Sequence, residues 1–197
     1  MAFFSPEFQT TLAPKSKGDY CNPSSITEGS PLRFAILSPS PLEGFEIWFE
    51  KPDGTMTKRI SAHWPDAEML SDYETEVGGK VVDRDGKKAI KACTSFFIWD
   101  FDSEAVRLFS ANQKTLIGEM LTICADPDYE DLSKWDFKLA RSGKGTDTKY
   151  HVNIINTKRE NAKVAAQVTA AWAEAQAQGY NLEALYYGGN PFSAAQA

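Results

Sequence analysis

Hydrophobic and polar residues alternate in several short segments of the chain, a pattern typical of β-strands with one buried face. In residues 44–50, Phe45, Ile47 and Phe49 share one face, while Trp48 lies between two glutamates on the other. Similar apolar segments predict further strands at residues 32–37, 91–101, 106–110, 135–141 and 149–155. The chain is therefore expected to be mainly β.

Two segments have helical periodicity instead. An apolar stripe at helical spacing runs through residues 112–126, where Asn112 can cap the start and Pro127 ends the helix. An Ala-rich segment after residue 158 predicts a second helix that ends near Gln178.

The order of these elements matches the OB-fold, a five-stranded Greek-key barrel with one helix between its third and fourth strands. We expect this barrel over residues 31–157, preceded by an N-terminal arm (1–30) and followed by a C-terminal helix and tail (158–197). The highly charged residues 51–91 are expected to form long loops that include a hairpin.

Composition and charge narrow the class of protein. The 197 residues, 42% of them hydrophobic, can form one substantial core with an appendage. A formal net charge of −6 argues against a surface that binds nucleic acid all over, but it allows a local basic groove. The three cysteines are far apart and form no CxxC motif, so we expect no metal site, no other cofactor and a reduced intracellular protein. No apolar run suggests a signal peptide or a membrane span.

The segment RSGKGTDTKYHV, residues 141–152, could form either a phosphate-binding loop or a turn between strands. A P-loop needs the pattern GxxxxGK[ST] between a strand and a helix. Here Lys144 stands between Gly143 and Gly145, and the residues that follow favour a strand. The segment is therefore predicted to be a hairpin turn in which both glycines allow positive φ.

Charge is unevenly distributed along the chain. Residues 132–159 contain seven Lys or Arg and two acidic residues, whereas residues 100–131 contain two Lys or Arg and eight acidic residues. This predicts a basic surface around the hairpin, although such a cluster can also be a solvated surface without a ligand.

Four segments, taken in order, resemble the single-stranded DNA-binding proteins of tailed bacteriophages: LRFAIL, GFEIWFE, SFFIWDFDSEAVRLFSANQKTL and DPDYEDLSKWDFKLARSGKGTDTKYHV. The similarity covers about residues 32–152, and its most specific part is the string RxGxGxDTxYxV. The resemblance implies an OB-fold and the binding of single strands during phage replication, recombination or repair, in the cytoplasm of the infected bacterium. It also implies phage replication or recombination proteins as partners. Residues 160–197 hold three Glu, one Lys and no Asp, which departs from the acidic tail found in some of these proteins.

Proteins that bind single strands without sequence preference combine aromatic rings for stacking with cations along the phosphate path. The candidate aromatic contacts are Trp48, Trp64, Phe97, Trp99 and Tyr150. The candidate phosphate contacts are Lys58, Arg59, Lys138, Arg141, Lys144 and Lys149. In the strand at 91–101, Phe96 and Ile98 are expected to point inward, with Phe97 and Trp99 either facing the bases or packing against the N-terminal arm. Trp172, in the C-terminal helix, is a candidate for packing or self-association.

Two other kinds of function fit parts of the sequence. Asp128, Asp136 and Lys138 are similar to the PD-(D/E)xK motif of metal-dependent nucleases, but they lack the strand context of that site. A structural or partner-binding phage protein could use the same fold without binding DNA. We expect a non-enzymatic protein, because no nucleophile elbow is present and there are only two histidines.

Overall fold

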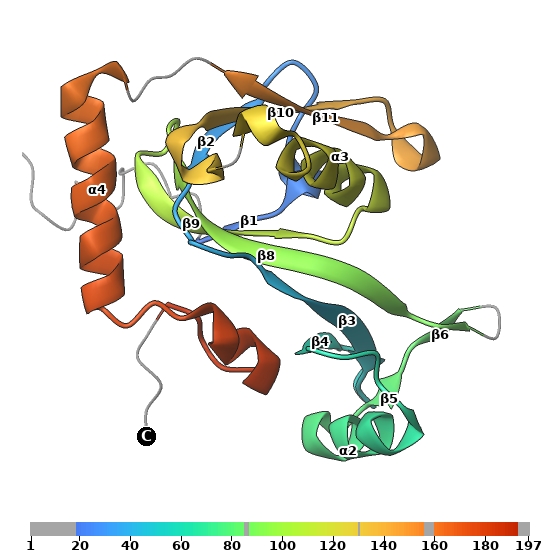
Figure 1. The fold of residues 1–197 in the computed structure, drawn as a ribbon. Coiled ribbons are helices and arrows are strands. Elements are labelled where there is room, and N and C mark those ends of the chain that lie inside the picture. Colours follow the sequence, from blue (N-terminus) through green and yellow to red (C-terminus); the bar gives the residue numbers. More distant parts are fainter. Residues whose placement is uncertain (1–18, 85–86, 130, 156–159, 193–197) are drawn as a thin grey trace, which may run out of the picture.

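The computed structural model describes residues 19–84, 87–129, 131–155 and 160–192 (Figure 1). The strands are β1 (Tyr20–Cys21), β2 (Leu32–Ile36), β3 (Leu42–Glu50), β4 (Met56–Ser61), β5 (Lys80–Val81), β6 (Asp83–Arg84), β7 (Lys87–Lys88), β8 (Ile90–Asp100), β9 (Ala105–Ala111), β10 (Asp136–Ser142) and β11 (Lys149–Ile155). The α-helices are α2 (Ala67–Val77), α3 (Lys114–Cys124) and α4 (Ala162–Ala177). The 3-10 helices are η1 (Pro23–Ser25), η2 (Pro127–Tyr129), η3 (Leu132–Lys134), η4 (Gly145–Asp147) and η6 (Leu182–Tyr187).

Nine of the described strands form one mixed, open sheet, so the prediction of a mainly β protein with a C-terminal helix is confirmed. Its main path runs β1-β9-β8-β2-β10-β11, and every pair along it is antiparallel except β1 with β9. Strands β2 and β3 both pair with β8, through Ala35 opposite Trp99 and Leu42 opposite Ser95. They therefore act as one long strand that is interrupted at residues 37–41.

The inner face of the sheet forms the main core. Phe96 and Ile98 point into it, as the sequence predicted, and Phe34 stacks on Phe109 and Phe137 there. Helix α3 packs against this face through the fully buried Leu116.

The start of α3 differs from the predicted cap. The N-cap residue is Gln113, which makes no side-chain capping hydrogen bond. Asn112 instead donates its amide N–H to Glu46 at 2.7 Å, because it is the first residue after β9 and lies beside β3.

The outer face of the same sheet is covered by the C-terminal segment. Helix α4 packs Val168 against Trp99 and Phe101, and η6 covers Leu42 and Cys93 further along the sheet. Figure 1 shows α4 and η6 along one side of the strands. The segment after residue 160 is thus an integral layer of the fold.

The predicted N-terminal arm (1–30) is only partly within the described residues. From residue 19 onward it belongs to the fold: β1 pairs with β9, and Cys21 and Ile26 are buried in the main core. Residues 1–18 lie outside the described part.

Residues 51–91 contain more regular structure than the predicted loops. Strand β4 pairs with β3, and β6 and β7 form the expected hairpin. Helix α2 lies between β4 and β5, with Asp66 as its N-cap and Gly78 in the left-handed conformation at its end. Its Leu70 packs on Ile47 and Phe49 of β3, which accounts for that buried face of the strand.

Candidate nucleic-acid interface

Trp64 is the most exposed tryptophan of the described residues, with 63% of its surface accessible. It lies in the short connection between β4 and α2, where Phe45 of β3 supports its ring edge-on at a centroid distance of 5.4 Å. Because the support comes from one side, a large part of the indole remains available for contact with a ligand.

A surface hollow of about 570 Å³ surrounds this tryptophan. The hollow is also lined by Lys87 and Lys88 of β7 and by Ile90 at the start of β8. Both lysines are exposed, and neither forms an ion pair with a described residue. An exposed ring and two lysines are therefore brought together here; Asp66 also lines the hollow, and the Lys88 charge acts on Glu74 of α2.

The turn between β10 and β11 has the predicted hairpin geometry. Gly143 and Gly145 have φ values of 75° and 57°, and η4 continues the turn. Lys144 and Lys149 are exposed at this turn and make no ion pair with described residues, and Lys138 is half-buried on β10. Figure 1 shows this turn and the β6–β7 hairpin on the same side of the molecule.

Arg141 has a structural role in this hairpin. Its guanidinium donates from Nη1 to the backbone carbonyls of Ser24 at 2.8 Å and Ile26 at 3.2 Å. It thereby holds the segment that follows β1 against β10. The guanidinium binds these carbonyl oxygens and does not project into solvent.

Trp48, Lys58 and Glu46 form a separate network on β3 and β4. The Glu46 carboxylate accepts hydrogen bonds from Trp48 Nε1 and Lys58 Nζ, both at 2.7 Å, and Lys58 Nζ lies 5.7 Å from the Trp48 ring centre. Burial raises the pKa of Glu46, but these donors, the Lys58 charge and Asn112 outweigh burial and lower the pKa overall. Arg59 is paired with Glu76 of α2. Trp48, Lys58 and Arg59 are thus committed to intramolecular contacts.

Phe97 and Trp99 point to the outer face of the sheet, as predicted, but they are only 1% and 4% exposed. Phe97 contacts the rings of Trp172, Tyr180 and Phe192 at centroid distances of 5.5, 5.3 and 6.0 Å. Among the described residues, the C-terminal segment covers them, so these rings cannot stack on bases while that segment is in place.

Tyr150 is buried in the main core because its side chain faces inward from β11. It is therefore a packing residue in this arrangement.

The residues of the nuclease motif do not share a common environment. Asp128 is exposed in η2, whereas Asp136 is fully buried in β10. Within the described ranges, no group of three or more His, Cys, Asp or Glu side chains could hold a metal ion. None of the described helices is long and apolar enough to span a membrane.

The structure thus brings Trp64 together with two lysines that were not among the predicted site residues. Lys87 and Lys88 belong to the segment DRDGKK, whose Asp-Gly is a hairpin signal with two adjacent cations after it. Their distance of more than twenty residues from Trp64 in sequence concealed the association. No protein-family model matches the chain, and neither a curated protein nor a solved structure is significantly similar to it.

Proposed function

We propose that this protein binds single-stranded DNA without strong sequence preference. The observation that carries the proposal is the exposed indole of Trp64, held edge-on by Phe45 in a hollow with Lys87 and Lys88. Stacking of a base on such a ring contributes roughly 1–3 kcal/mol, and every base has a face that can stack. The two lysines supply the cations that the adjacent phosphates need.

The strand pairing supports an OB-type barrel as the scaffold. When β2 and β3 are counted as one strand, the five strands in chain order are β2–β3, β8, β9, β10 and β11. The β2–β3 strand pairs with β8 and β10, β8 pairs with β9, and β10 pairs with β11. Helix α3 lies between the third and fourth of these strands, which is the position of the OB-fold helix.

In this assignment, two pairs of exposed lysines, Lys87 with Lys88 and Lys144 with Lys149, fall in or next to the loops that OB-folds use. Oligonucleotides contact the loop between the first and second strands and the loop between the fourth and fifth strands. The first corresponds to residues 51–89, which carry Trp64 and Lys87, and the second carries Lys144 and Lys149. A DNA strand that passes from one loop to the other would contact both pairs of lysines.

The strand face that OB-folds also offer to DNA is occupied here by α4. The proposed contact therefore depends on the loops, with Trp64 replacing Phe97 and Trp99 as the main stacking ring. We further propose that the protein acts on phage DNA during replication or recombination in an infected bacterium, together with other phage proteins, and that it cleaves no nucleic acid.

The proposal can be tested by fluorescence anisotropy with a labelled oligothymidylate. Trp64→Ala should weaken binding about 5- to 150-fold, which corresponds to the loss of roughly 1–3 kcal/mol of stacking energy. If Lys87, Lys88, Lys144 and Lys149 each contact a phosphate, the logarithm of the affinity should fall with the logarithm of salt concentration with a slope of about −3.

Two double variants distinguish a specific DNA-binding site from a general effect of net charge on the affinity for DNA. K87E/K88E should weaken binding strongly, whereas K114E/K163E makes the same charge change at exposed residues on α3 and α4 and should have a much smaller effect. The proposal is wrong if Trp64→Ala changes affinity less than twofold and both double variants behave alike. Shortening of the labelled strand after addition of Mg²⁺ would instead support the nuclease alternative.

A further inference from the structure

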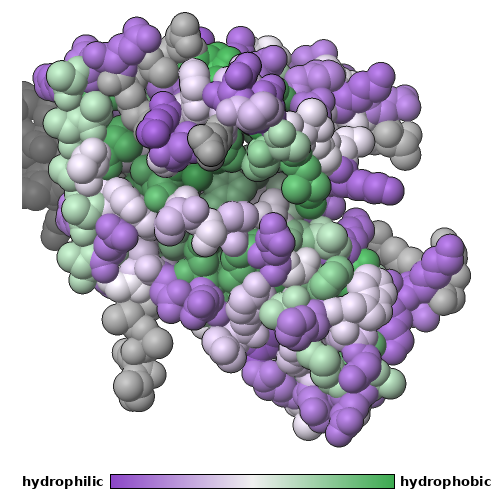
Figure 2. Space-filling view, viewed as in Figure 1, coloured by the Kyte–Doolittle hydropathy of each residue, from purple (hydrophilic) through white to green (hydrophobic). Residues whose placement is uncertain are grey.

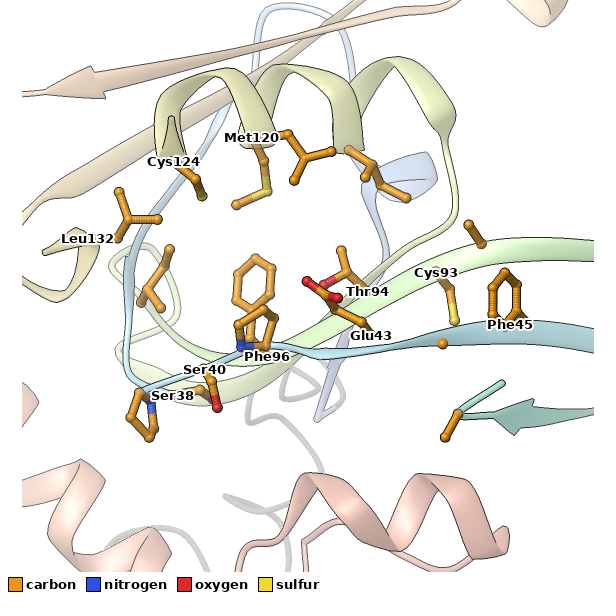
Figure 3. Close-up of a pocket in the computed structure, with 18 residues that line it drawn as sticks. Ser38, Ser40, Glu43, Phe45, Cys93, Thr94, Phe96, Met120, Cys124 and Leu132 are labelled. Carbon is orange, nitrogen blue, oxygen red and sulfur yellow. The ribbon is translucent and has the colours of Figure 1, made fainter. Parts of the chain in front are cut away.

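A second cavity, separate from the Trp64 hollow, lies between α3 and the strands beneath it (Figure 3). Its volume is about 430 Å³, within the range of 300–1,000 Å³ that is typical of ligand sites. The walls are mostly apolar and include Ile36, Phe45, Phe96, Ile117 and Met120. Figure 2 shows hydrophobic surface recessed in the middle of this view, with hydrophilic regions above and below it.

One charged side chain, Glu43, is among the residues that line this cavity. It lies opposite Thr94 in the pairing of β3 with β8, and Figure 3 shows its carboxylate directed into the space below α3. The carboxylate makes no hydrogen bond or ion pair with any described residue. Glu43 is itself exposed, so the cavity combines an apolar interior with one solvent-accessible negative charge at its edge.

The apolar surface continues beyond the mouth of the cavity. Leu121 of α3 lines it and is still 59% exposed, and Cys124 is exposed one turn later. On the opposite side, Pro39 and Pro41 are also exposed. A compact small molecule would leave this rim uncovered, whereas a chain that passes over the rim would bury it.

We propose that this cavity binds a peptide segment of a partner protein, in which a bulky apolar side chain is next to Lys or Arg. The apolar side chain would fill the space between Phe96 and Met120, as buried anchors do in protein interfaces. The adjacent cation would pair with Glu43, and this charge complementarity gives the site its specificity. The same carboxylate disfavours phosphate, so the site is distinct from the DNA contacts and does not depend on the proposed DNA-binding function.

Cys124 provides a direct measure of occupancy, because it lines the cavity and is exposed while Cys21 and Cys93 are buried. Partial burial of the sulfur and the nearby Glu43 raise the pKa of the Cys124 thiol, so alkylation should be followed at alkaline pH. The probes are four peptides, acetyl-Ala-Φ-Lys-Φ-Ala-amide with Φ as Leu, Ile, Met or Phe, and the same four with Glu in place of Lys. At least one Lys peptide should slow the alkylation of Cys124, and the affinity measured from this protection should be about tenfold higher than that of its Glu counterpart. A tenfold ratio of affinities corresponds to about 1.4 kcal/mol.

Glu43→Gln should abolish this preference for Lys over Glu while the apolar part of the affinity remains. Glu68→Gln, an equal change of charge at an exposed position on α2, should retain the preference. The Cys124→Ser variant confirms which thiol reacts. The proposal is overturned if no Lys peptide protects Cys124 better than its Glu counterpart, or if Glu43→Gln leaves the preference intact. Equal protection by Lys and Glu peptides would mean a purely apolar site.

Discussion

The buried ion pair between Arg107 and Asp100 allows a quantitative test of what stabilises the sheet. Arg107 Nη1 lies 2.9 Å from Asp100 Oδ2, and the aspartate side chain is completely buried. The other end of the guanidinium donates to the backbone carbonyl of Tyr20, so one side chain connects β9, the end of β8 and β1.

Arg107→Met keeps most of the apolar stem and removes the charge that compensates Asp100. Breaking a buried pair on one side typically costs about 3–5 kcal/mol, because the remaining charge is left without its partner. We expect the lower part of that range, since Asp100 keeps a hydrogen bond of 2.9 Å from the Asp102 N–H. With a urea m-value of about 2–3 kcal/mol/M, the unfolding midpoint should fall by about 1–1.5 M.

Urea unfolding monitored by circular dichroism measures this change directly. The control is Lys134→Met, which removes the exposed pair of Lys134 with Asp131 and should leave the midpoint unchanged. In the double variant R107M/D100N, the loss should be smaller than the sum of the two single losses. Surface substitutions typically shift the urea midpoint by no more than about 0.2 M. A midpoint for Arg107→Met within about 0.2 M of wild type would therefore refute the reasoning.

Two further predictions concern pH and backbone conformation. Glu46 has a lowered pKa in the folded protein because hydrogen bonds and the Lys58 charge outweigh the effect of burial. The ionised carboxylate therefore stabilises the fold fully above the ordinary pKa of 4.5, and this stabilisation is lost as the pH falls through the lower pKa of the folded state. Glu46→Gln should therefore make the unfolding free energy less dependent on pH in urea titrations between about pH 3 and 6, and an unchanged profile would contradict this. Gly143→Ala should lower thermal stability more than Gly145→Ala. Alanine in the positive-φ conformation of either glycine costs about 1–2 kcal/mol. At Gly143 the added Cβ would also lie 2.4 Å from the Asp147 carbonyl oxygen. Equal melting temperatures for the two variants would show that this contact is relieved by a local shift.

Periodicity predicted six of the strands (β2, β3, β8, β9, β10 and β11) and two of the helices within a few residues, because these elements bury one clear apolar face. Strands β1, β4 and β5 were not predicted. Helix α2 was missed because its apolar residues are few, and only Leu70 is buried among charged neighbours. Its start and end signals, Asp66 and Gly78, were present in the sequence. Their meaning depends on β3, whose buried face the helix covers.

The candidate site was less predictable for a related reason. Alternation along β8 correctly separated Phe96 from Phe97, but it could not show that α4 and the residues after it would cover the outer side. Likewise, the charge pattern could not distinguish Arg141, whose guanidinium binds backbone carbonyls, from Lys144, which remains exposed. Both outcomes depend on segments more than sixty residues away.

The cover over Phe97 and Trp99 also has a consequence for how the chain is made. Translation delivers β8 well before α4, so a nascent chain carries an apolar strip that nothing yet shields. Chains truncated just after β11 should therefore recruit chaperones or aggregate, whereas chains that extend through Phe192 and have left the ribosome should not.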